Sequence, residues 1–421
     1  MSVTELQPEL IEKSKQASCR SCSRVGLEPV LDLGMMALSD GLLTEEQLAG
    51  GKEGKYPLEV AYCPDCSLVQ ILETVAPETL FGDEYPYYSS FSDALLTHSR
   101  KNVLELIERR NLTRDSHVVE LASNDGYLLK NYVEQGISVQ GIDPAAGPVE
   151  AARKIGVPTI HDFFTLDLAK KLAAEGKQAD IIHGNNVLAH VADTNGFVEG
   201  IRTLLKDDGM AVIEAPYVRD LIDHCEFDTI YHEHLCYFSV TALDQLFRRH
   251  GLYLNDVRRL SIHGGSLRLF LEPTENVMDS VKTLLAEEKE LGVDQYPYYD
   301  DFRHRVEAVR QKMQQILSDL KAQGKRIAGY GAAAKGAIML NYIGAGVDQI
   351  EYVCDRNVHK QGRFMPGTHN PICDPARILE DMPDYVVILP WNFKDEIMSQ
   401  QAEYRDRGGK FIIPIPEPTI V

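Results

Sequence analysis

The chain has 421 residues, with 44% hydrophobic and 25% charged side chains, and its 63 acidic and 43 basic groups give a net charge of −20. This length predicts roughly two to four domains, with cores large enough to need no disulfide support. So acidic a surface repels a phosphate backbone, which argues against nucleic acid as a partner.

The first segment, residues 1–18, is polar and lacks the apolar core of a signal peptide. No apolar run reaches the ~18–20 residues that a membrane helix requires. Eight cysteines are too sparse for a disulfide framework in a chain of this length. We therefore expect a cytoplasmic protein with no membrane partner, present as a monomer or a small homo-oligomer.

Two C-x-x-C pairs follow, Cys19 with Cys22 and Cys63 with Cys66. Two residues between thiolates let both sulfurs of a tight turn face one ion, and two such turns complete the tetrahedral four-sulfur site typical of structural zinc. We interpret the pairs as a closed site that supplies folding energy to a zinc-binding domain at residues 1–80. The segment between the pairs is longer than in the commonest zinc ribbons. Unrelated core thiols and a redox pair remain alternatives.

Residues 85–92 (YPYYSSFS) are rich in tyrosine and serine. Such a segment suits a lid with hydroxyl donors, so Tyr88 and Ser89 are candidate substrate-binding residues. An aromatic seam between domains is the alternative interpretation.

From about residue 115 the pattern becomes β–α–β, beginning with a buried strand at His117–Leu121. The next strand ends in Asp143, and residues 179–191 and 210–216 contain further apolar strands that reach polar ends. Strands alternating with helices predict an α/β domain with a mostly parallel sheet, at residues 81–285, that binds ligands at the strand carboxyl ends.

The turn after the first strand, residues 120–126 (ELASNDG), predicts the cofactor. A dinucleotide fold would need G-x-G-x-x-G, and two of those three positions are not glycine here. The acidic residue and looser turn instead resemble motif I of class I methyltransferases. Adenosylmethionine has no phosphate, and its cationic amino and sulfonium groups favour nearby carboxylates. The candidate cofactor residues are Glu120, Ser123, Asn124, Asp125, Gly126, Asp143 for the ribose, Asp162 and Phe163 for the adenine, and Asn185 and Asn186 at the mouth. Asp143 as a plain strand-end carboxylate and Asn186 as a turn residue are the alternatives.

The densest group of reactive side chains is the run Tyr231, His232, Glu233 and His234. Carbon methylation needs a general base, and a histidine with a pKa near neutrality suits that task. A neighbouring carboxylate can fix its tautomer, and a tyrosine hydroxyl can hydrogen-bond a developing enolate oxygen. A satisfied buried loop, a metal site and a solvated turn are competing interpretations. His190 is a further titratable group, either in the site or in the core.

Residues 262–267 (IHGGSL) lie between two strand-like runs, and the glycines permit positive φ. His263 is therefore either turned into the site as a substrate-binding residue or the end of a hairpin.

The remaining chain, residues 286–421, predicts a second α/β (Rossmann-like) domain. Residues 299–323 are predicted to form an amphipathic helix with apolar positions at Phe302, Val306, Val309, Met313, Leu317 and Leu320. A strand, a glycine-rich turn and a helix then follow, and the backbone amides of residues 329–336 with Lys335 can hold a diphosphate at the helix N-terminus.

Several motifs now coincide: CRSC and CPDC, ELASNDGYLL, YHEH, HGGSLR, GYGAAAKG, and CDRN with KQG and PGT. Together they resemble the sugar-nucleotide C-methyltransferases, zinc-containing enzymes of branched deoxysugar biosynthesis. The resemblance runs from about residue 19 to 415.

The resemblance implies a zinc domain, an adenosylmethionine domain and a C-terminal domain that helps to enclose the substrate, a nucleoside-diphosphate 4-keto-6-deoxysugar. It implies that the base removes the C3 proton and that the enolate takes the methyl group with inversion. His234 is then the base, supported by Tyr231 and Glu233. Methylation at C5, or at oxygen or nitrogen of another metabolite, is the main alternative. A non-catalytic zinc adaptor and a dehydrogenase using the C-terminal glycine turn are less favoured.

Overall fold

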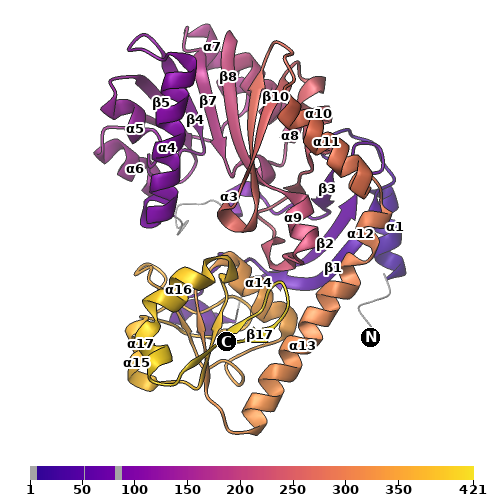
Figure 1. Cartoon of the computed structure of the whole chain (residues 1–421), viewed down its shortest axis with the longest axis vertical. Helices are drawn as coiled ribbons and strands as arrows, with labels where there is room; N and C mark the ends of the chain where they lie inside the picture. Colours follow the sequence, from indigo (N-terminus) through magenta and orange to yellow (C-terminus); the bar gives the residue numbers. More distant parts are fainter. Residues whose placement is uncertain (1–6, 52, 81–87) are drawn as a thin grey trace.

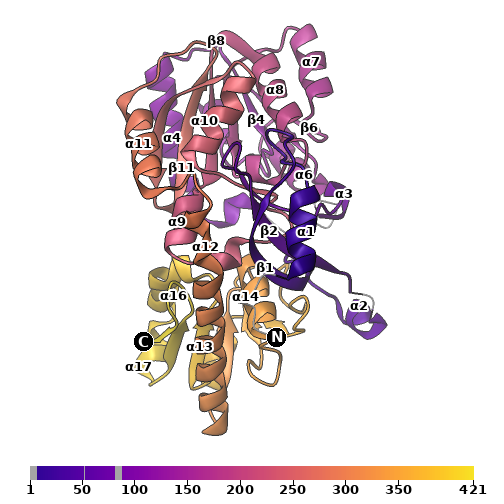
Figure 2. The same ribbon diagram turned by 90° about the vertical axis from the view of Figure 1, so that its right-hand side faces the viewer.

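The computed structural model describes residues 7–51, 53–80 and 88–421, which form three sheets with their covering helices (Figure 1). The methyltransferase-like sheet lies at the top of that view and the C-terminal domain below it. Figure 2 shows the N-terminal strands alongside both. Within the described ranges, no helix is long and apolar enough to cross a bilayer.

The N-terminal sheet is antiparallel in the order β1-β2-β3-β9. Its last strand, β9 (Cys236–Tyr237), comes from the middle of the chain, outside the predicted 1–80 segment. The residues that connect β1 to β2 reach the C-terminal domain, where Leu43 forms an isolated β-bridge with Phe364. The N-terminal elements are α1 (Pro8–Gln16), β1 (Glu28–Ala37), α2 (Glu45–Gly50), β2 (Lys55–Tyr62), β3 (Val69–Ile71) and α3 (Pro77–Leu80).

The central sheet has the order β10-β11-β8-β7-β4-β5-β6, with β4 to β8 parallel and β10 and β11 antiparallel. The strand order reverses at β4, which is the switch point where ligands bind in open α/β sheets. Its elements are η1 (Ser89–Phe91), α4 (Asp93–Arg110), β4 (His117–Leu121), α5 (Lys130–Glu134), β5 (Ser138–Asp143), α6 (Ala146–Lys154), β6 (Thr159–His161), α7 (Leu166–Ala174), β7 (Ala179–Asn185), η2 (Leu188–His190), α8 (Thr194–Leu204), β8 (Leu205–Pro216), α9 (Val218–Asp223), η3 (Phe227–Thr229), α10 (Val240–Arg249), β10 (Tyr253–Leu260), η4 (Ile262–Gly264), β11 (Ser266–Glu272) and α11 (Asp279–Leu291).

The alternation of side chains along β4 gives the central sheet two buried faces. Val118 packs in one apolar cluster with side chains of α4 and α5, whereas Val119 and Leu121 pack in the other with α7 and α8. Polar residues that end these strands therefore emerge at one edge, between two helical layers. The predicted class I methyltransferase fold is confirmed.

The C-terminal sheet has the order β14-β13-β12-β15-β16-β17 and is parallel except for β17. The connecting helix α13 buries all six predicted apolar positions. It begins at Phe302, after a separate short helix, rather than at residue 299. The elements are α12 (Pro297–Asp300), α13 (Phe302–Ala322), β12 (Ile327–Tyr330), α14 (Ala334–Ile343), β13 (Val353–Cys354), β14 (Ile372–Cys373), α15 (Ala376–Asp381), β15 (Tyr385–Ile388), η5 (Trp391–Phe393), α16 (Lys394–Gln400), α17 (Ala402–Asp406), β16 (Lys410–Ile413) and β17 (Thr419–Ile420).

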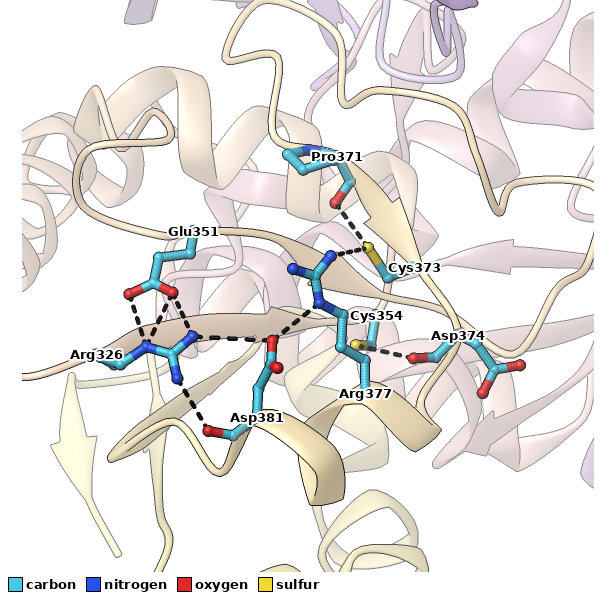
Figure 3. Close-up of polar contacts among 8 residues, drawn as sticks. All are labelled: Arg326, Glu351, Cys354, Pro371, Cys373, Asp374, Arg377 and Asp381. Carbon is cyan, nitrogen blue, oxygen red and sulfur yellow. Dashed lines mark hydrogen bonds and ion pairs between the residues drawn. The ribbon is translucent and has the colours of Figure 1, made fainter.

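Side-chain pairs link neighbouring strands of this sheet to one another and to α15 (Figure 3). Arg326 bonds Glu351 at 2.8 Å, and Arg377 Nη1 lies 3.0 Å from Cys373 Sγ. Cys354 and Cys373 are opposite one another in the ladder. The two arginines are exposed and their carboxylate partners are half-buried, and ion pairs this open to solvent contribute little stability. We therefore assign this cluster no role beyond local order.

Candidate active site and zinc centre

The four cysteines of the N-terminal pairs meet at one point. Their sulfur atoms all lie within 4.8 Å of one another, with Cys19 Sγ at 3.5 Å from Cys66 Sγ and Cys22 Sγ at 3.6 Å from Cys63 Sγ. Among the described residues, no other group of three or more His, Cys, Asp or Glu side chains is arranged to hold a metal. Sulfur atoms about 2.3 Å from a tetrahedral zinc ion fit such spacings, so the donor set suits the predicted structural zinc.

The predicted cofactor turn is a tight connection at the carboxyl end of β4. Ala122, Asn124 and Gly126 all have positive φ. A Cβ on Gly126 would lie 3.1 Å from Val157 Cγ2, so glycine lets the turn pack closely on the chain after α6. Asp143 ties the turn to β5, because its carboxylate accepts the main-chain N–H groups of Asn124 at 2.8 Å and Ala145 at 2.9 Å.

Several buried polar atoms around this turn have no hydrogen-bond partner in the described part of the chain. They are both carboxylate oxygens of Glu120, Ser123 Oγ, Asp125 Oδ1, and both side-chain polar atoms of Asn185. Buried polar groups are costly unless they are paired, so this set of donors and acceptors suits a polar ligand. The amino and sulfonium groups of adenosylmethionine would supply the positive charge that this acidic set lacks.

The other predicted cofactor residues lie at the same edge. The amide of Asp162 donates to Asp143 O at 3.1 Å, and Asp162 is exposed beside the half-buried Phe163. Asn186 has φ +52 and donates its amide to Glu214 O at 2.8 Å. The structure thus gathers these residues around one strand edge, and their individual cofactor contacts stay predictions.

Binding of adenosylmethionine should release a proton from Glu120. Burial, and then the charges of Asp143 and Asp125, raise the pKa of Glu120 well above its usual range. The carboxyl group is therefore protonated in the free protein below that raised pKa, and a bound cation favours the ionised form. Affinity should consequently rise as the pH rises toward the raised pKa. Calorimetry in buffers of different ionisation enthalpy measures the proton release, which Glu120→Gln should abolish. Release of the same size from that variant would contradict the assignment.

The acid–base run places Tyr231 and His234 face to face. The Tyr231 hydroxyl lies 2.9 Å from His234 Nε2, and their ring centroids are 4.0 Å apart. His234 Nδ1 lies 2.9 Å from the carbonyl oxygen of Thr229. Because a carbonyl oxygen only accepts, Nδ1 carries the proton of the neutral ring and Nε2 is left as the basic nitrogen.

This geometry corrects the expectation that a carboxylate sets the tautomer of His234. The main-chain carbonyl of Thr229 does so, while the carboxylate of the neighbouring Glu233 accepts a hydrogen bond from Ser39 Oγ at 2.9 Å. Burial, together with the negative charge of Asp40, raises the pKa of Glu233 to about 7. Glu233 is thus held by the N-terminal domain, and its part in catalysis stays a prediction.

His190 lies beside His234, with the two ring centroids 4.7 Å apart. Burial lowers the pKa of His190 to about 4, so it is neutral near pH 7. Since η2 follows closely on β7, and Leu235 donates its amide to Ala189 O at 2.7 Å, His234 lies next to the carboxyl end of β7.

The part of the predicted lid that the structure describes is hydrogen-bonded to the predicted cofactor turn. Ser89 N donates to Asn124 Oδ1 at 2.8 Å and Ser90 N donates to Asp125 Oδ2 at 3.1 Å. The Tyr88 ring stacks on His359 of the C-terminal domain, with centroids 5.9 Å apart, at the rim of a pocket of about 560 Å³. Residues 85–87 of that motif lie outside the described residues.

The HGGS segment forms η4 and the turn into β11, and only its backbone is described at His263. A Cβ on Gly264 would lie 2.7 Å from Glu226 Oε2, and one on Gly265 would lie 2.2 Å from Asp220 Oδ2. A side chain at either position would crowd one of these carboxylates, so both positions favour glycine. Substrate binding by His263 stays a prediction.

Lys335 lies in a buried seam between the central and C-terminal domains. Its ammonium is 4.7 Å from the Trp391 ring centroid and donates to Asn392 Oδ1 at 3.0 Å, while Trp391 Nε1 donates to Asp228 Oδ2 at 2.8 Å. Burial lowers the pKa of Lys335, and the carboxylates of Asp228 and Glu226 oppose that shift. A diphosphate would have to compete with these carboxylates for the ammonium.

The glycine-rich turn before α14 offers fewer free amides than the sequence predicted. Gly329 N donates to Tyr352 O, Gly331 N to Cys354 O and Ala332 N to Asp355 Oδ2. The main-chain amides named here, in the first half of residues 329–336, therefore already donate to groups within the protein. Lys360, which the sequence did not single out, donates to Ala332 O at 2.7 Å beside the same turn.

Comparison with protein families gives three matches along the chain. A family described as a zinc binding domain matches residues 19–81, a methyltransferase domain matches residues 95–257, and a "C-methyltransferase C-terminal domain" matches residues 261–416. The chain is 36% identical to the C-methyltransferase NovU of Streptomyces niveus over 406 residues, which cover 96% of each protein.

More distant relatives match a smaller share of the chain. The ubiquinone biosynthesis O-methyltransferase of Chelativorans sp. (strain BNC1) is 29% identical over 97 residues, covering 23% of this chain and 38% of that protein. Among solved structures, the PH0226 protein of Pyrococcus horikoshii OT3 is 15% identical with a TM-score of 0.35, covering 45% of this chain and 95% of its own. Magnesium protoporphyrin IX methyltransferase from Synechocystis PCC 6803 with bound SAM is 13% identical with a TM-score of 0.33, covering 46% and 88%.

Proposed function

The chain belongs to the adenosylmethionine-dependent, zinc-binding C-methyltransferases, and from this premise we propose that its substrate is a nucleoside-diphosphate 4-keto-6-deoxysugar methylated at C3. The proposal includes a cytoplasmic role in branched deoxysugar biosynthesis. It also includes the three predicted domains, with limits at residues 1–80, 81–285 and 286–421.

One observation carries the proposal. His234, with Nε2 as its basic nitrogen and the Tyr231 hydroxyl 2.9 Å from it, lies next to the carboxyl end of β7. Strand β7 pairs directly with β4, whose end bears the unpaired polar atoms of the cofactor turn. A base and a site for a cationic methyl donor therefore share one edge of one sheet. Carbon methylation requires this juxtaposition.

The proposed chemistry uses the ketone to acidify the adjacent carbon. When bound, adenosylmethionine supplies an electrophilic methyl group. His234 Nε2 takes the C3 proton, and the electrons of that C–H bond move onto the C4 oxygen. In this proposal the Tyr231 hydroxyl donates a hydrogen bond to that oxygen as its negative charge develops. The enolate would then offer its electron pair at C3 to the methyl group of adenosylmethionine, which the turn after β4 would hold, and the sulfur would leave with the electrons of its bond to that methyl group.

The experiment that tests this proposal compares two substrates that differ at one carbon. The protein is incubated with adenosylmethionine and a thymidine-diphosphate 4-keto-6-deoxysugar, and separately with the same sugar reduced to the C4 alcohol. We expect mass spectrometry to show a gain of one methyl group on the ketone alone. Equal methylation of the alcohol would contradict an enolate mechanism and would indicate transfer to oxygen.

A further inference from the structure

The segment that carries the base is also a strand of the N-terminal sheet. In β9, Cys236 and Tyr237 pair with Gln70 and Val69 of β3. Just before β9, Ile71 N donates to Leu235 O at 3.1 Å. The residues immediately after His234 are therefore fixed by main-chain hydrogen bonds to the zinc-binding domain.

The side chains of His232 and Glu233, which lie between Tyr231 and His234, point toward the zinc-binding domain. His232 Nε2 lies 3.3 Å from Pro57 O, and its ring is 5.8 Å from that of Tyr56. The carboxylate of Glu233 accepts a hydrogen bond from the hydroxyl of Ser39 at 2.9 Å. Tyr231 and His234 are the members of the run that face each other instead.

The zinc cluster sets the position of the strand that receives this segment. Cys63 directly follows β2, and Cys66 lies just before β3. Cys63 N donates to Leu68 O at 2.8 Å, which closes the turn between these strands. A path of adjacent groups thus runs from the metal ligands through β3 to β9 and the base.

We propose that Ser39 is a positioning residue for the reaction, and that the zinc-binding domain fixes the approach of His234 by holding Glu233 and β9. This gives the domain a part in catalysis beyond its own folding. The inference rests on the proposed function of His234 as the base. A shift of about 1 Å in a reacting group can reduce a rate by roughly a hundredfold, so a small loss of anchoring has a measurable effect.

The test compares Ser39→Ala, which removes the donor to Glu233, with Ser39→Thr, which keeps a hydroxyl. Ser14→Ala is the matched control, because Ser14 is a fully buried serine of the same domain whose hydroxyl has no partner among the described residues. Zinc content and melting temperature are measured first. Steady-state kinetics on the keto-sugar follow, with NMR of the His234 ring in histidine-labelled protein assigned through His234→Asn.

We expect Ser39→Ala to keep its zinc and to lower kcat by about ten- to a hundredfold, with KM changed by less than about twofold. The NMR signals of the His234 ring should shift in Ser39→Ala. Ser39→Thr should restore both the kcat and the ring signals, and Ser14→Ala should change neither. Wild-type kcat and unmoved ring signals in Ser39→Ala would overturn the proposal. A fall in kcat with unmoved ring signals and no rescue by threonine would also overturn it.

If Ser39→Ala loses zinc, Ser39→Cys, which fills similar space with a weaker donor, is judged by the same criteria. If wild-type protein fails to methylate the keto-sugar, the proposed function is wrong. The ring signals still decide the positioning claim in that case, because they need no substrate.

Discussion

Replacing His234 by asparagine is expected to reduce methyl transfer by about 10²–10⁴-fold, the usual contribution of a positioned general base. Asparagine keeps a polar side chain of similar reach but cannot accept a proton at neutral pH. The same variant should also stop exchange of the C3 proton with deuterated water. Adenosylmethionine affinity should stay unchanged, because the cofactor turn belongs to β4 and the base to a later segment. Mass spectrometry of the sugar nucleotide reads both events, and calorimetry reads the affinity.

Tyr231→Phe is the informative companion to that variant. It keeps the ring that packs 4.0 Å from His234 but removes the hydroxyl that lies 2.9 Å from Nε2. We expect a smaller loss than for His234→Asn, with residual proton exchange. Wild-type exchange in His234→Asn would show that another group is the base and would contradict the assignment.

Loss of zinc is expected to unfold the N-terminal domain. Structural zinc contributes on the order of 10 kcal/mol to the folding of small zinc domains, far more than a short segment gains from its own core. Cys66→Ala should therefore remove the bound zinc and produce an early thermal transition. Scanning calorimetry and metal analysis measure these effects, and a chelator added to wild-type protein should reproduce them.

Cys373→Ser provides the matched control for the zinc variant. Cys373 is a half-buried cysteine of the C-terminal domain that takes no part in the four-sulfur cluster. It should retain full zinc and a wild-type transition. A Cys66→Ala protein with full zinc content and an unchanged transition would show that the cluster is not a structural metal site.

Local patterns predicted the elements whose periodicity is set by burial. The strand at His117–Leu121 has the predicted bounds, and Asp143 ends β5 as expected. The six apolar positions of α13 are all buried, because a period near 3.6 places them on one helical face. The predicted start of α13 was wrong, because a separate short helix precedes it.

The contacts that organise the candidate site could not be predicted in the same way. Ser39 and Glu233 are separated by 194 residues, and β9 is a two-residue strand with no periodicity to detect. Thr229 acts through its main-chain carbonyl, which every residue possesses. The motif at residues 231–234 predicted a group of acid–base side chains, but which side chain faces which domain depends on tertiary packing.

The measurement that tests the central claim most directly is the position of the transferred methyl group. The protein is incubated with the keto-sugar nucleotide and adenosylmethionine labelled with ¹³C in its methyl group, and the product is examined by carbon NMR. We predict one-bond ¹³C–¹³C coupling between the new methyl carbon and C3 in a sugar labelled at C3. A methyl signal without that coupling, at a shift typical of attachment to oxygen or nitrogen, would contradict C-methylation at this site.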